Sequence, residues 1–108
     1  MLSKRATPLS PTETATAALT LWREKIDALN LQLLGLLETR GRAVESIMAL
    51  KQDLGTDSYD PNRESAMLAM IESHVSGPYA RDQVGRVFLA IFEVSRELGR
   101  NFRRPRDD

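Results

Sequence analysis

Between residues 11 and 51, apolar residues recur every three or four positions, the spacing that places them on one face of an α-helix. Ser10, Pro11 and Glu13 supply a cap, a first-turn proline and a capping-box acid. The pattern predicts a helix of roughly 35–40 residues, against a mean of about 11–12, and a helix this long usually packs against a second chain. The predicted face contains Trp22, Ile26, Leu29, Leu33, Leu36, Val44 and Ile47.

Two shorter helices are predicted to follow. Turn residues from Asp53 to Tyr59 end the first helix, and Asp60-Pro61 provides a cap and a first-position proline for the second, which ends at Ser76-Gly77-Pro78. The third helix is expected from about Tyr79 to Leu98. No segment has the pattern of a strand, so we predict an all-α fold of three helices with a very long first helix. The apolar sides are Ala66, Met67, Met70 and Ile71, then Val84, Val87, Phe88, Ile91, Phe92 and Leu98.

Composition narrows the functional classes. The 108 residues suit one small domain, predicted to span residues 11–100 between a disordered tail at 1–10 and a charged tail at 101–108. Fifteen basic residues balance fifteen acidic ones, so no net field attracts nucleic acid or a membrane surface. The absence of cysteine and the single histidine argue against disulfides, thiolate chemistry and a metal cluster. With neither a signal peptide nor a membrane span in the sequence, we expect a cytoplasmic protein.

Three cations interrupt the apolar face of the first helix. Arg40 and Lys51 fall within the face and Arg23 lies at its edge. Their long stems are able to carry the charges to water, but three such residues with few acids beside them favour an anionic ligand between helices. Arg40 and Lys51 lie roughly 16 Å apart along the axis, whereas Arg23 precedes Arg40 by roughly 25 Å. If all three serve one small ligand, Arg23 must come from an antiparallel partner chain.

Four further polar residues are candidates for the same site, although each also has an ordinary structural explanation. Asp60, Arg63 and Glu64 open the second helix, where an acid suits the helix dipole. Ser95 lies in line with the apolar residues of the third helix, and a lone serine there often bonds a carbonyl one turn back.

In combination, these positions resemble the all-helical class of chorismate mutases over about residues 20–100. The subgroup that the chain resembles most is fused to or associated with 3-deoxy-arabino-heptulosonate-7-phosphate (DAHP) synthase. The resemblance is carried by Leu21 to Asn30, Leu33-Leu34, Glu38-Thr39-Arg40, Lys51, Tyr59 to Glu64, Gly77-Pro78 and Ile91 to Ser95.

The resemblance implies an intertwined helical homodimer that rearranges chorismate to prephenate without a metal or cofactor. Arg23 would reach a substrate carboxylate in the neighbouring chain's site, and Arg40 would hold a carboxylate in its own. Lys51 would contact a carboxylate and the ether oxygen of the breaking bond. The remaining implied contacts are Asp60 and Glu64 on the ring hydroxyl, with Arg63 and Ser95 completing the site.

One position departs from the family pattern. Many members carry Gln or Glu one turn beyond the serine, where this chain has Gly99. Loss of that donor would lower the rate by about 10²–10³-fold unless Glu97 or Arg100 replaces it. Gly99 supports one alternative to the mutase, a weakly active or inactive regulatory subunit of DAHP synthase. Two less favoured alternatives do not depend on Gly99: an isochorismate-pyruvate lyase, which shares the fold, the arginines and the lysine, and a plain helical dimerisation module.

Overall fold

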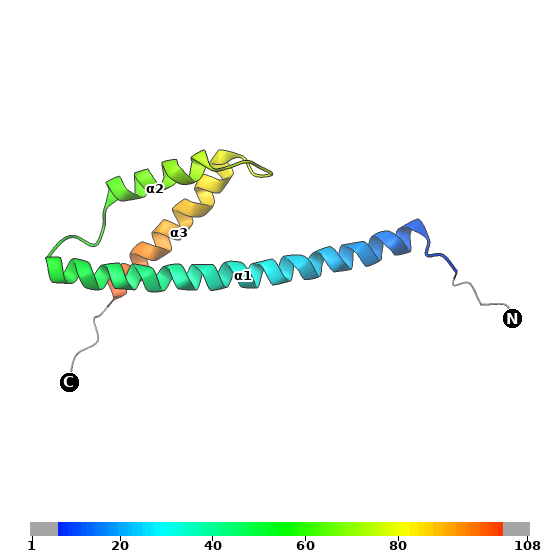
Figure 1. The fold of residues 1–108 in the computed structure, drawn as a ribbon, viewed down its shortest axis with the longest axis horizontal. Helices are drawn as coiled ribbons and strands as arrows, with labels where there is room; N and C mark the ends of the chain where they lie inside the picture. The colour runs from blue at the N-terminus through cyan, green and yellow to red at the C-terminus, as the bar shows by residue number, and fades with distance from the viewer. Residues whose placement is uncertain (1–6, 103–108) are drawn as a thin grey trace, which may run out of the picture. The chain divides into compact units, whose positions relative to one another are not determined.

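The computed structural model describes residues 7–102, which form three helices and no strand. Helix α1 spans Pro11–Leu54, α2 spans Pro61–Ser73 and α3 spans Arg81–Asn101 (Figure 1). With 44 residues, α1 is roughly 66 Å long. The prediction of an all-α fold with a very long first helix is confirmed. The predicted dimer is not tested by a single chain.

The first two helices begin where the sequence predicts them. The Ser10 hydroxyl accepts the Glu13 N–H at 3.1 Å, and α1 begins at Pro11. The Asp60 carboxylate accepts the Arg63 N–H at 3.0 Å and caps α2. Capping therefore sets both helix starts, as expected from the unpaired N–H groups of a first turn.

Other boundaries differ from the prediction by a few residues. Helix α2 stops at Ser73, capped by His74, three residues before the Ser76-Gly77-Pro78 turn. Helix α3 begins at Arg81 instead of Tyr79 and continues to Asn101. The connection, residues 74–80, is longer than predicted, and within it Gly77 has a φ of 104°, a left-handed conformation that glycine adopts readily.

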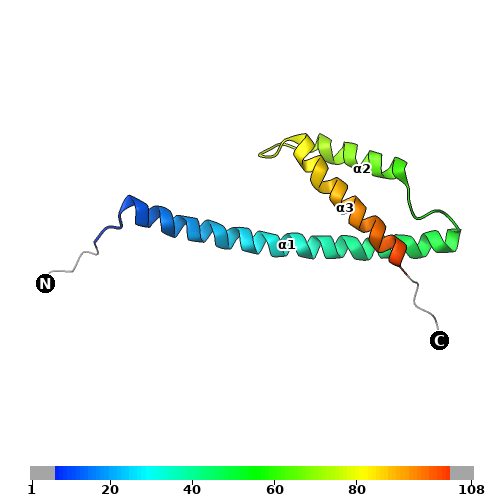
Figure 2. The same ribbon diagram turned by 180° about the vertical axis from the view of Figure 1, so that it is seen from behind.

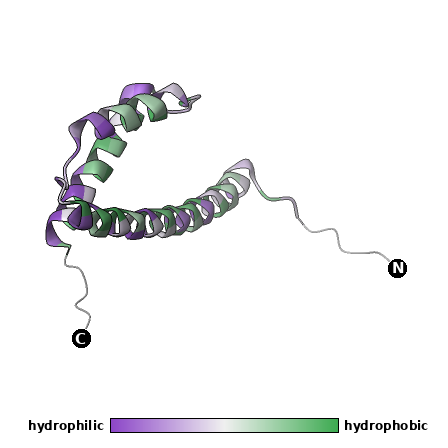
Figure 3. Ribbon diagram, turned by 60° about the vertical axis from the view of Figure 1, so that its left-hand side comes forward, coloured by the Kyte–Doolittle hydropathy of each residue, from purple (hydrophilic) through white to green (hydrophobic). Residues whose placement is uncertain are grey.

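The chain divides into two compact units, residues up to Glu38 and residues from Thr39 onward. In the first unit, residues 11–38 are the first part of α1, and green and purple alternate around the ribbon because apolar and polar residues do (Figure 3). Its large apolar side chains are exposed in the single chain. They include Leu19 (48%), Trp22 (63%), Ile26 (55%), Leu29 (45%), Leu33 (63%) and Leu36 (68%). The packing predicted for this face is therefore absent from one chain.

The second unit contains residues 39–54 of α1 together with α2 and α3. Helices α2 and α3 lie beside each other near the turn that joins them (Figures 1 and 2). Gly85 of α3 is buried against α2, where an added Cβ would lie 3.8 Å from Leu68. Among the described residues, the buried large apolar side chains are Met48 and Phe92, at 8% and 2% exposure. The core of this unit is therefore very small.

The predicted tails and domain limits remain predictions. Residues 1–6 and 103–108 lie outside the described residues, so most of both predicted tails cannot be compared with the structure. Within the described part, no helix is both long and apolar enough to cross a membrane.

Candidate active site

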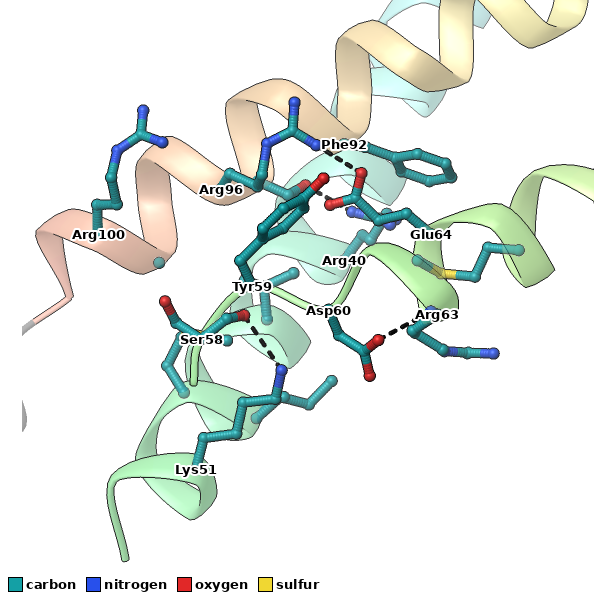
Figure 4. Close-up of a pocket in the computed structure, with 16 residues that line it drawn as sticks. Arg40, Lys51, Ser58, Tyr59, Asp60, Arg63, Glu64, Phe92, Arg96 and Arg100 are labelled. Atoms are coloured by element: carbon teal, nitrogen blue, oxygen red, sulfur yellow. Dashed lines mark hydrogen bonds and ion pairs between the residues drawn. The ribbon is translucent and has the colours of Figure 1, made fainter. Parts of the chain in front are cut away.

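A cavity of about 530 Å³ lies in the second unit, among the last turns of α1, the loop before α2, the start of α2 and the C-terminal half of α3 (Figure 4). Cavities of this size hold small organic ligands. Its lining residues are Arg40, Val44, Ile47, Met48, Lys51, Ser58, Tyr59, Asp60, Arg63, Glu64, Met67, Phe92, Ser95, Arg96, Gly99 and Arg100.

Arg40 is fixed from α3. Its Nη1 donates to the Ser95 hydroxyl at 2.6 Å, and its guanidinium lies over the Phe92 ring, 5.6 Å from the centroid. Ser95 in turn donates to the Ile91 carbonyl at 2.7 Å. Because the single hydroxyl proton is given to that carbonyl, a lone pair of Ser95 faces Arg40. The guanidinium is thus held on two sides before any ligand arrives.

Lys51 reaches the loop before α2. Its Nζ donates to the Ser58 carbonyl at 3.1 Å, close to where the chain turns toward Asp60 (Figure 4). The ammonium group has three donors, so two remain for other acceptors. The lysine therefore ties the end of α1 to the loop and also presents its charge to the cavity.

The carboxylates at the start of α2 are held in different ways. Asp60 uses Oδ1 for the helix cap and is exposed, whereas Glu64 is partly buried and forms an ion pair with Arg96. The distance from Arg96 Nη1 to Glu64 Oε1 is 2.5 Å. Arg96 also lies over the Tyr59 ring, 5.3 Å from its centroid.

The Glu64 carboxylate raises the pKa of Arg96 above its ordinary value, mainly through their hydrogen bond. Because the ordinary pKa of an arginine is already high, this guanidinium stays charged at every working pH. Arg96 is therefore a permanent cation of the cavity.

Gly99 lines the cavity where the resemblance places a Gln or Glu side chain. A Cβ built at Gly99 would lie 3.0 Å from the Met48 sulfur, which occupies the neighbouring space. Of the two proposed replacements, Arg100 lines the cavity and Glu97 does not. A side chain at position 99 would therefore require the buried Met48 side chain to shift.

The structure brings together six of the seven site residues predicted from the sequence. Arg23 belongs to the first unit and does not line the cavity. Arg96 was missed by the sequence interpretation. The six that line the cavity are Arg40, Lys51, Asp60, Arg63, Glu64 and Ser95.

The charges of the cavity define what it can bind. Five cations and two carboxylates line it, which leaves an excess of three positive charges. Most of the other lining residues are apolar, and these are Val44, Ile47, Met48, Met67 and Phe92. Such a site suits a small, partly apolar ligand with more than one negative charge. The fold and site together define an all-helical protein with a cavity suited to a small polyanion.

Comparison with known proteins identifies the family. The sequence profile of chorismate mutase type II matches residues 22–100, which is most of the chain. The chain therefore belongs to the type II chorismate mutases, a family of isomerases.

Two solved structures are similar to this chain, and both are chorismate mutase from Thermus thermophilus. Form II is 34% identical with a TM-score of 0.76, and the match covers 78% of this chain and 96% of that one. Form I is 36% identical with a TM-score of 0.71, and the match covers 72% of this chain and 98% of that one. No curated protein sequence matches the chain significantly.

Proposed function

We propose that the chain rearranges chorismate to prephenate in the cavity of the second unit, in phenylalanine and tyrosine biosynthesis. The observation that carries this proposal is the cavity's excess of three positive charges over an apolar lining. Chorismate has two carboxylates on a small carbon framework, so its charge and its ring match the two kinds of surface. Family membership supplies the reaction.

Arg40 and Lys51 hold the substrate carboxylates from α1, and Lys51 also faces the ether oxygen of the breaking bond. The support for Arg40 is its fixed position between Ser95 and Phe92. Lys51 has donors to spare beyond its bond to Ser58. Charge that develops on the ether oxygen in the transition state is then met by a cation already in place, the arrangement that lowers a barrier most effectively.

At the start of α2, the carboxylates of Asp60 and Glu64 hold the ring hydroxyl of the substrate by hydrogen bonding. Arg63 and Ser95 complete the site. The rearrangement is intramolecular and pericyclic, so it needs no nucleophile and no transfer of a proton. The residues accelerate it by holding the reactive chair conformer and by excluding water from the dianion.

The site is completed by a second copy of the chain in an intertwined homodimer. Arg23 does not line the cavity of its own chain, and the apolar side chains of residues 11–38 are exposed. An antiparallel partner covers that face and brings its own Arg23 to a substrate carboxylate. This arrangement explains why Arg23 is absent from the cavity lining of its own chain. It also explains the exposed apolar face, since large exposed apolar patches mark association surfaces.

A regulatory subunit of DAHP synthase is the second candidate. Gly99 favours it, because the cavity offers no side chain at that position and Met48 fills the adjacent space. In that case the chain binds chorismate or prephenate, is slow alone, and associates with a separate synthase. Isochorismate-pyruvate lyases generally lack the Asp-x-x-Arg-Glu arrangement. That alternative is disfavoured because Asp60, Arg63 and Glu64 are all present here and line the cavity.

The test of catalysis is the loss of chorismate absorbance with purified protein, with the product identified as prephenate. Rapid turnover supports the mutase. Absence of turnover, both alone and with DAHP synthase added, rejects it. Activity that arises only when the synthase is present supports the regulatory pairing.

The shared site is tested by mixing two inactive variants, Arg23→Ala and Arg40→Ala. A hybrid dimer contains one site with both arginines intact, so mixing restores part of the wild-type rate, in proportion to the share of hybrids that subunit exchange produces. If subunit exchange is demonstrated and no activity returns, the two residues do not serve one site across the dimer.

A further inference from the structure

Arg96 is the charged residue of the cavity whose place the sequence did not predict. It follows Ser95 on α3 and reaches across to α2, where its Nη1 lies 2.5 Å from Glu64 Oε1. Its guanidinium also lies 5.3 Å from the centre of the Tyr59 ring, on the loop before α2. One side chain thus connects three segments of the site (Figure 4).

The contact uses only one of the two Glu64 oxygens. Oε1 accepts from Arg96, and Oε2 has no hydrogen-bond partner among the described residues. A carboxylate accepts about four hydrogen bonds, so the pair leaves capacity for a ligand hydroxyl. Glu64 is partly buried, and the cavity lies beside it.

We propose that Arg96 is a positioning residue that holds the Glu64 carboxylate oriented toward the substrate hydroxyl. The inference rests on the proposed function and adds a residue to it. A charge-assisted hydrogen bond fixes one oxygen, and the Tyr59 ring stabilises the guanidinium that makes that bond from a second side. Glu64 is then already ordered when the substrate arrives, so substrate binding does not have to restrict its side chain.

The pair also has a geometric advantage over a free carboxylate. A glutamate has three side-chain torsions, and an unrestrained one spreads its oxygens over several rotamers. Anchoring Oε1 to a different helix removes most of that freedom. Displacement of a substrate-orienting group by about 1 Å is enough to lower a rate by about a hundredfold.

A kinetic double-mutant cycle tests the inference, with Arg96→Leu, Glu64→Ala and the double variant. We expect Arg96→Leu to lower kcat/KM by about 10–100-fold. In the Glu64→Ala background the same change should lower it by no more than about twofold, because Arg96 acts only through the Glu64 carboxylate, which that background lacks. Arg96→Lys should give an intermediate rate, since an ammonium still donates to one oxygen but lacks the rigid fork of the guanidinium.

Arg86→Leu is the matched control, because Arg86 is an exposed arginine of the same helix that does not line the cavity. It should keep the wild-type kcat/KM. Thermal melts monitored by circular dichroism accompany each variant. If the leucine variant does not fold, Arg96→Lys and Arg96→Gln complete the same cycle.

The outcomes separate this inference from the proposed function. If the two single variants each lose activity and their losses multiply in the double variant, Arg96 acts independently of Glu64 and contacts the substrate itself. That result would overturn the positioning role. An unchanged kcat/KM in Arg96→Leu would overturn it as well. If the wild type shows no turnover, the same cycle is measured on the affinity for prephenate by calorimetry. The inference is supported if the effects of the two substitutions on that affinity are not additive. A wild type that neither turns over chorismate nor binds prephenate would overturn both the proposed function and the positioning role of Arg96.

Discussion

Replacing Ser95 by alanine removes the oxygen that holds Arg40 in place while leaving the helix that carries it intact. In the structure Arg40 Nη1 donates to this hydroxyl at 2.6 Å, and the hydroxyl donates to the Ile91 carbonyl at 2.7 Å. In the variant, Arg40 keeps the Phe92 ring beneath it but loses its hydrogen-bonded restraint. We therefore expect a loss of activity without a loss of folding.

The magnitudes of the two effects differ. A hydrogen bond to a charged group contributes about 1.5–3 kcal/mol, and water recovers part of that for the partly buried Arg40. We therefore take a value just below that range, about 1.4 kcal/mol, which corresponds to a tenfold fall in kcat/KM. For stability, alanine has a helix propensity better than serine by about 0.5 kcal/mol, which offsets the lost bond to Ile91. The free energy of unfolding should change by less than about 1 kcal/mol.

The assay measures kcat/KM from chorismate absorbance and stability from urea denaturation of the same preparations. Ser46→Ala is the control, because Ser46 makes the same kind of bond to the Arg42 carbonyl on α1 and does not line the cavity. That variant should match the wild type in both measurements. A Ser95→Ala variant with the wild-type rate, or one whose activity falls only in proportion to its stability, would refute the reasoning.

Three further predictions follow from the helix ends and glycines. Asp60→Ala should destabilise the fold by about 1 kcal/mol through the lost cap, whereas Asp60→Asn should keep the melting temperature and lose about tenfold in kcat/KM with the carboxylate charge. Gly85→Ala should stabilise by about 0.5–1 kcal/mol in urea denaturation, because the one close approach of the added Cβ, 2.8 Å, is to the movable carboxylate of Glu72, and its 3.8 Å distance to Leu68 is an ordinary contact; a destabilised variant would show that Glu72 cannot move. Gly99→Gln should exceed Gly99→Ala in kcat, since both meet Met48 but only glutamine adds a donor; equal rates would mean that position 99 does not face the ether oxygen.

Local signals in the sequence predicted the elements and much of the site. The cap at Asp60 and the proline after it located the start of α2 because both act within one turn. Arg40 and Lys51 were found because a cation inside an apolar stripe is anomalous wherever it occurs. Both line the cavity.

Features that depend on contacts between distant segments were not predictable in this way. Arg96 occupies a position on α3 where a charge needs no explanation, and its partner Glu64 lies 32 residues away. Trp22 and Met70 were assigned to packing by periodicity but are 63% and 57% exposed in the single chain. Periodicity shows that a face is apolar, and it does not show which chain covers it.

The burial of Phe92 and Met48 has a consequence for attempts to engineer this protein. These two side chains are the buried large apolar residues of the described chain, and both also line the cavity. Phe92 supports Arg40 from below, and Met48 occupies the space beside Gly99. Any repacking chosen to raise the melting temperature will therefore reshape the floor of the binding site. Thermostabilised variants are better sought at helix caps and on exposed helix surfaces, where the two properties are separate.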